Sequence, residues 1–98
     1  MTEIVTVLAH ARAKPGLEER ARKILEELVG LTRAEAGCLD YDLHESLQQP
    51  GVFMFYENWA TAADLETHGR SEHIARFRKK CGEVLAEGPV VTRWSRLD

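Results

Sequence analysis

The segment VFMFYENW, residues 52–59, constrains the fold more than any other, because it alternates like a β-strand yet begins apolar on both faces. One face carries Phe53, Phe55, Glu57 and Trp59, and the other carries Val52, Met54, Tyr56 and Asn58. A strand with apolar residues on both sides needs a cover on both sides. The helices of a 98-residue chain can supply one cover, so a second sheet or a second subunit must supply the other. We therefore predict a homodimer packed through open sheet faces.

Three further segments have the period of strands. Residues 3–12 and 38–45 alternate between apolar and polar side chains, and residues 90–97 are rich in β-branched and aromatic residues. The side chains predicted to point inward from the first two are Val5, Val7, Ala9, Ala11, Leu39, Tyr41 and Leu43.

The remaining segments have the apolar spacing of helices. Residues 17–32 form one such stripe, and a second helical region begins at Thr61, breaks near Gly69 and restarts at Ser71. The segment EGP, residues 87–89, is predicted to stop the last helix, and Gly37 the first. The order is β-α-β-β-α-β. This order predicts a single α+β domain over residues 1–98, ferredoxin-like, with an antiparallel sheet and both helices on one face.

Composition narrows the classes of function. The net charge of −3 and the pI near 5.8 argue against nucleic acid as a partner. No apolar run approaches the roughly 20 residues that span a bilayer, and the N-terminal MTEIVTVLAHAR lacks the basic start of a signal peptide. We therefore expect a cytoplasmic protein with no membrane partner. Cys38 and Cys81 are then expected to be reduced, buried and inert.

The candidate catalytic and binding residues cluster in ENWATAADLETHGRSEH, residues 57–73. Glu57 shares a strand face with aromatic residues, so its carboxyl either has a raised pKa or is ionised and satisfied by a donor. His68 and His73 border the helical apolar stripes, where each has either a structural hydrogen bond or a functional role. Their spacing of five residues matches no zinc motif, even with Glu57 as a third ligand, so we predict no metal site.

Trp59 closes an aromatic-lined space together with Phe53, Phe55 and Phe77. An apolar cavity with a few convergent polar groups is the usual form of a small-molecule site. The sequence has no glycine-rich phosphate loop, serine elbow or cysteine–histidine nucleophile signature, so we expect no nucleotide, flavin or haem cofactor.

Several pieces of the sequence together resemble the antibiotic biosynthesis monooxygenase domain family, and within it the small quinol monooxygenases. They are EAGCLDYDL (residues 35–43), Glu57-Asn58-Trp59, Leu65-x-x-His68, His73 and Phe77. The resemblance runs nearly end to end. It implies a dimeric α+β barrel with a pocket between helices and sheet in each subunit. It also implies oxidation of polycyclic anthrones or quinols by molecular oxygen, without metal or flavin.

The family's functional residues carry over in part. Trp59 matches the tryptophan of the anthrone oxygenases, but Phe55 stands where they have an asparagine and Leu65 where they have a pocket tyrosine. These differences argue against the anthrone-oxygenase mechanism. The haem-degrading branch is matched less well, because three of its functional positions are occupied by other residues here: Ala9, His68 and Arg78.

From this resemblance we predict a cofactor-independent monooxygenase that acts on a small aromatic or quinol-type substrate with molecular oxygen. His68 or His73 would be the base that takes a phenolic proton, and Glu57 would orient that histidine. The residues predicted to contact the substrate are Trp59, Phe55, Leu65 and Phe77. Two alternatives remain open: an isomerase or another enzyme of small carbonyl compounds on the same fold, and a non-catalytic module that binds small molecules.

Overall fold

A computed structural model describes residues 3–98, so the first two residues of the predicted domain lie outside the described part. The elements in chain order are β1 (Val5–Ala13), α1 (Glu18–Arg33), β2 (Cys38–Glu45), β3 (Val52–Trp59), α2 (Ala62–Gly69), α3 (Glu72–Val84) and β4 (Leu85–Trp94). The sheet order is β2-β3-β1-β4, with every neighbouring pair antiparallel. This confirms the ferredoxin-like α+β arrangement, with the second helical region divided into α2 and α3.

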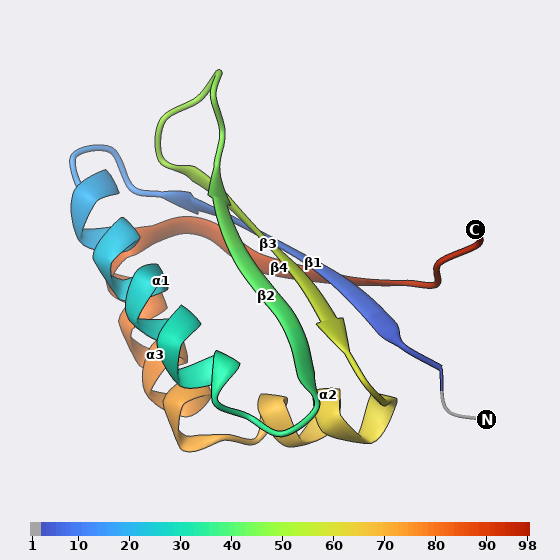
Figure 1. Ribbon diagram of the computed structural model, residues 1–98. Helices are drawn as coiled ribbons and strands as arrows, with labels where there is room; N and C mark the ends of the chain where they lie inside the picture. The colour runs from blue at the N-terminus through green and yellow to red at the C-terminus, as the bar shows by residue number, and fades with distance from the viewer. Residues whose placement is uncertain (1–2) are drawn as a thin grey trace.

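β3 begins and ends where the sequence predicted, and it occupies an interior position between β2 and β1. Figure 1 shows α1, α2 and α3 on one side of the sheet, with none of the described elements over the other side. The four side chains that face the helices are buried: Phe53, Phe55, Glu57 and Trp59. Tyr56, on the opposite face, is 40% exposed. Within residues 3–98 the helices therefore cover only one face of the strand.

The core lies between the sheet and the helices, mainly α1 and α3. The buried side chains of these two helices are Ala21, Leu25, Leu28, Thr32, Ile74, Phe77, Cys81 and Val84. Each large apolar side chain buried in this way contributes about 1.5–3 kcal/mol relative to its exposure. None of the described helices has the length and apolar character needed to cross a bilayer.

A hydroxyl cap starts each of the helices α2 and α3. The Thr61 hydroxyl accepts a hydrogen bond from the Asp64 backbone N–H at 3.0 Å, and the Ser71 hydroxyl accepts one from the Ile74 N–H at 3.4 Å. Such caps typically stabilise a helix by about 1 kcal/mol. Because α2 ends at Gly69 and α3 starts anew after Ser71, the chain changes direction between them.

Leu39 points outward, and the prediction that it faces the core is wrong. Cys38 pairs with Trp59 and Asp40 with Asn58, so β2 has one more residue than β3 across this step. This β-bulge reverses the alternation locally. Leu39 is therefore 50% exposed, whereas Tyr41, beyond the bulge, is buried as predicted.

The last strand starts earlier than predicted, at Leu85 instead of residue 90, and it ends at Trp94. EGP therefore lies inside β4 and does not stop α3. Gly88 has φ +87°, and a Cβ there would lie 2.4 Å from the His10 carbonyl oxygen. Only glycine fits so close to β1, which allows the strand to continue through a register irregularity where a helix stop was expected.

Two leucines of α1 provide a test of the core. Leu25 is 1% exposed and Leu31 is 50% exposed on the same helix. We expect Leu25→Ala to lower the free energy of unfolding by about 2–5 kcal/mol, because it leaves a cavity under the helix. Leu31→Ala should change it by less than about 0.5 kcal/mol. Urea denaturation of both variants measures the difference, and equal losses would contradict this packing.

Candidate functional site

A cavity of about 410 Å³ lies between the helices and the sheet, which is within the usual size of small-molecule sites. Strands β1, β3 and β4 and helices α2 and α3 all contribute to its lining. Five of the seven predicted site residues line it: Phe55, Glu57, Leu65, His68 and Phe77. The other two, Trp59 and His73, are not on its surface.

His68 lies in the last turn of α2 and is 7% exposed. Two aromatic rings hold its imidazole. The Trp59 ring centroid lies 4.6 Å from that of His68, at an interplanar angle of 33°, and the Tyr41 centroid lies 5.6 Å away, at 64°. The imidazole therefore sits in one packed orientation at the edge of the cavity.

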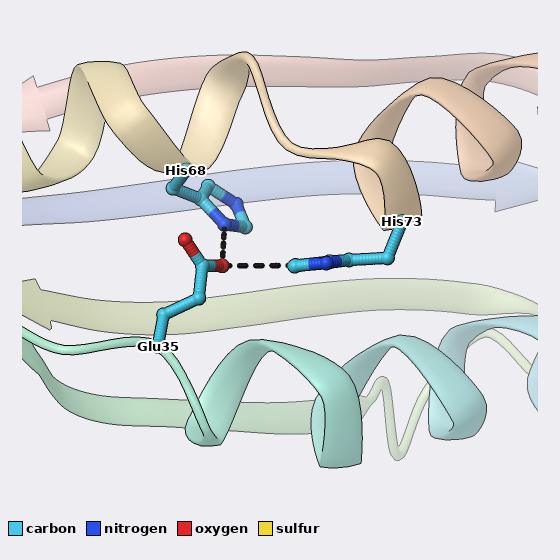
Figure 2. A group of neighbouring side chains, drawn as sticks. All are labelled: Glu35, His68 and His73. Atoms are coloured by element: carbon cyan, nitrogen blue, oxygen red, sulfur yellow. Dashed lines mark hydrogen bonds and ion pairs between the residues drawn. The ribbon is translucent and has the colours of Figure 1, made fainter.

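A single carboxylate oxygen joins both histidines (Figure 2). The Nδ1 of His68 lies 2.6 Å from Oε2 of Glu35, and the Nε2 of His73 lies 2.9 Å from the same oxygen. Their side chains are only 9–15% exposed. The Ser71 hydroxyl is a further neighbour, 3.3 Å from the His73 Nε2.

Glu35 reaches this position from the turn between α1 and β2. Gly37 in that turn has φ +86°, and a Cβ there would lie 2.3 Å from the Asp64 side chain at the start of α2. This close approach holds the turn against α2. The structure therefore corrects the prediction for Glu57: the carboxylate that orients the histidines is that of Glu35. Sequence patterns missed Glu35 because it lies in a turn, and only its presence in EAGCLDYDL pointed to it.

The hydrogen bond to Glu35 also fixes which nitrogen of His68 is free. A carboxylate can only accept, so the Nδ1 of His68 carries a proton. Burial lowers the pKa of His68, which favours the neutral ring with an unprotonated Nε2. Within the described residues this Nε2 has no hydrogen-bond partner, and it is not among the fully enclosed polar atoms. It is therefore an unpaired basic nitrogen on a side chain that lines the cavity.

Glu57 supplies a second titratable group to the cavity. Its Oε1 accepts a hydrogen bond from the Trp59 indole Nε1 at 2.9 Å. Burial raises its pKa from 4.5 to about 7, although the bond from Trp59 acts in the opposite direction. Among the described residues Glu57 bonds to neither histidine. A carboxyl with this pKa can hold or release a proton near neutral pH.

Trp59 has no exposed surface. It packs behind the cavity, where it donates to Glu57 and stacks on His68. The prediction that Trp59 contacts a substrate ring is therefore corrected. Its contacts are with Glu57 and His68, which do line the cavity. It is a packing and positioning residue.

Among the lining side chains that were absent from the predicted site are Tyr41, Arg78 and Arg93. Burial raises the pKa of the Tyr41 phenol, so this group stays protonated. Arg93 is paired with Val7 in the sheet, which directs it to the helix side. Neither arginine has an acidic partner within the described residues, so two cationic groups are available at the cavity.

Comparison with known proteins gives consistent results. The model of the antibiotic biosynthesis monooxygenase family matches residues 4–80. The chain is 34% identical over 98 residues to Rv0793 of Mycobacterium tuberculosis, covering 100% of this chain and 96% of that protein. It is 29% identical over 83 residues to YcnE of Bacillus subtilis, covering 85% and 87%. Both relatives are named provisionally as monooxygenases. The crystal structure of PA3566 from Pseudomonas aeruginosa superposes with a TM-score of 0.93 at 36% identity, covering 100% and 98%.

The raised pKa of Glu57 makes stability depend on pH. Its folded-state pKa of about 7 exceeds the ordinary 4.5, so between these values the folded protein binds more protons than the unfolded chain. The free energy of unfolding should therefore fall as pH rises from 4.5 to about 7, by up to about 3 kcal/mol from this group.

Glu57→Gln isolates this contribution, because the amide oxygen can still accept from Trp59 but does not titrate. Urea denaturation of both proteins at several pH values measures it. A wild type and a variant with parallel pH profiles would show that the Glu57 carboxyl titrates normally.

Proposed function

The chain belongs to the antibiotic biosynthesis monooxygenase family, and from this premise we propose that it is a cofactor-independent monooxygenase that oxidises quinol-type or polycyclic phenols with molecular oxygen. One observation carries the proposal: His68 lines an aromatic-lined cavity with its Nε2 unpaired among the described residues, while Glu35 holds the other ring nitrogen. The provisional names of Rv0793 and YcnE support the same class of reaction.

The first step is deprotonation of the substrate. The Nε2 of His68 accepts the phenolic proton, and Glu35 stabilises the imidazolium that forms, as the acidic member of a catalytic triad does. Arg78 and Arg93 are cations without acidic partners in the described chain, and they stabilise the phenolate. The pair His68 and Glu35 therefore makes the substrate electron-rich without any cofactor.

The phenolate then reduces oxygen. It passes one electron to O₂, and the two radicals combine into a carbon–oxygen bond on the ring, giving a hydroperoxide. Cleavage of the O–O bond releases one oxygen atom as water and leaves the other on the ring. For a hydroquinone with a free ring position, hydroquinone plus O₂ gives hydroxyquinone plus water, and the substrate supplies all four electrons.

The leaving oxygen needs a proton, and Glu57 is suited to supply it. Its pKa of about 7 keeps a large fraction of the carboxyl protonated near neutral pH. The indole of Trp59 holds its other oxygen in place. In this role Glu57 is a general acid, separate from the base His68.

The apolar lining binds the ring and excludes water. Phe55, Leu65 and Phe77 are buried side chains of the cavity surface. Aromatic and aliphatic contacts recognise a flat hydrophobic ring system, and exclusion of water protects radical intermediates from side reactions.

We also propose that the protein acts as a homodimer through the open face of the sheet. Leu39, Tyr56 and Trp94 line one broad hollow of about 890 Å³ on that face, and all three are at least 40% exposed. Exposed large apolar side chains that gather on one face favour association with a second copy.

The central prediction is that His68→Ala lowers turnover by roughly 10²–10⁴-fold, because the base is lost, while binding of the substrate changes little. Oxygen uptake with a panel of hydroquinones, using metal-free and colourless protein, measures the turnover. His44→Ala is the matched control, because His44 is exposed and does not line the cavity.

Activity that depends on added iron or flavin would contradict the cofactor-independent mechanism. Turnover without oxygen consumption would point to the isomerase class, and binding without turnover to a ligand-binding module.

Substitution on the open face of the sheet tests the proposed homodimer. We expect sedimentation of the wild type to give a dimer at micromolar concentration and Tyr56→Glu to shift it toward monomer, since the variant buries a charge in the interface. A folded wild-type monomer at that concentration would overturn the dimer proposal.

A further inference from the structure

The three side chains of Figure 2 present a set of metal-ligating atoms. One ligand atom from each of the three residues lies within 4.8 Å of the other two. The His68 Nδ1 and the His73 Nε2 both contact the same Glu35 oxygen. They come from three separate segments, the end of α2, the start of α3 and the turn after α1. The fold therefore brings the imidazoles of His68 and His73 to one oxygen of the distant Glu35.

We propose that Glu35, His68 and His73 form a binding site for a divalent first-row transition metal ion, with Zn²⁺ as the representative ion. Two imidazoles and one carboxylate are the ligand set of several catalytic zinc sites and of non-haem iron sites. These donors bind at about 2.0–2.2 Å from Zn²⁺. The three donor atoms lie within 4.8 Å of one another, close enough to share one ion.

The surroundings of the three residues favour binding of a metal ion, because the donor side chains are shielded from water and held in place. Their side chains are 9%, 14% and 15% exposed, so little water competes for the donors. The aromatic rings of Trp59 and Tyr41 restrict the His68 imidazole, and Ser71 lies beside that of His73. Groups that orient ligands in this way raise metal affinity. Three protein ligands leave further coordination positions open for water or a small anion.

The ion and the proposed base use the same imidazole. Coordination at Nδ1 moves the proton of the neutral His68 ring to Nε2, which then no longer accepts a proton from the substrate. On the proposed function, the bound ion is therefore an inhibitor of oxidation. The existence of the metal site does not depend on that function.

Isothermal titration with Zn²⁺, after treatment with a chelator, tests the site directly. We expect one ion per chain for the wild type and at least ~100-fold weaker binding for Glu35→Gln and for His73→Ala, more than the loss typical of outer-sphere groups. His44→Ala and Cys38→Ser should bind as the wild type does, because neither residue belongs to the cluster. Circular dichroism checks that each variant is folded.

Co²⁺ bound to the wild type gives a second readout that needs no variant. We expect the weak visible absorption of Co²⁺ bound by nitrogen and oxygen ligands, without the strong near-ultraviolet bands of a Co²⁺–thiolate bond. No binding to the wild type, thiolate bands, or unchanged binding in folded Glu35→Gln and His73→Ala would overturn the site. Oxygen uptake with and without Zn²⁺ is measured separately: one-to-one binding without inhibition would contradict the role of His68 as base and leave the metal site standing.

Discussion

One oxygen atom, the Oε2 of Glu35, connects parts of the chain that no regular element joins. It contacts ring nitrogens of His68 and His73, which lie 33 and 38 positions after Glu35 in the sequence. This contact fixes the joint between α2 and α3 over one end of the cavity. The orientation of His68, the tautomer of its ring and the lining next to it all depend on that oxygen. A chain with the same helices but without this contact would have a cavity and no oriented base.

The environments of His68 and Glu57 shift the pKa values of these two cavity side chains in opposite directions. Burial lowers the pKa of His68 and raises that of Glu57, so each is driven toward its neutral form. A neutral imidazole is a proton acceptor and a neutral carboxyl is a proton donor. Trp59 links them physically, since it bonds to one and stacks on the other. An acid and a base therefore coexist in one apolar space without neutralising each other in an ion pair.

The sequence allowed prediction of the elements whose burial has a simple period. β3, the stripes of α1 and α3 and the caps at Thr61 and Ser71 follow from alternation, helical spacing and hydroxyl chemistry. The bulge at Leu39 could not be predicted, because one inserted residue leaves no mark in an alternating pattern. Glu35 was missed for a different reason: its partners are distant in sequence, and a turn has no period. Glu57 was placed on the correct face of its strand, but only the structure identifies its hydrogen-bond partner as Trp59.

The pairing of β1 with β4 has a consequence for how the protein folds. The Thr92 hydroxyl donates to the Leu8 carbonyl across a separation of 84 residues, and β4 contacts the sheet only along β1. The β2–β3 hairpin and the helices involve shorter loops and can organise first, whereas closing so long a loop is entropically slow. Val91 and Arg93, which complete the cavity, arrive with that last strand. A chain in which β4 has not yet paired with β1 therefore lacks a fully lined cavity.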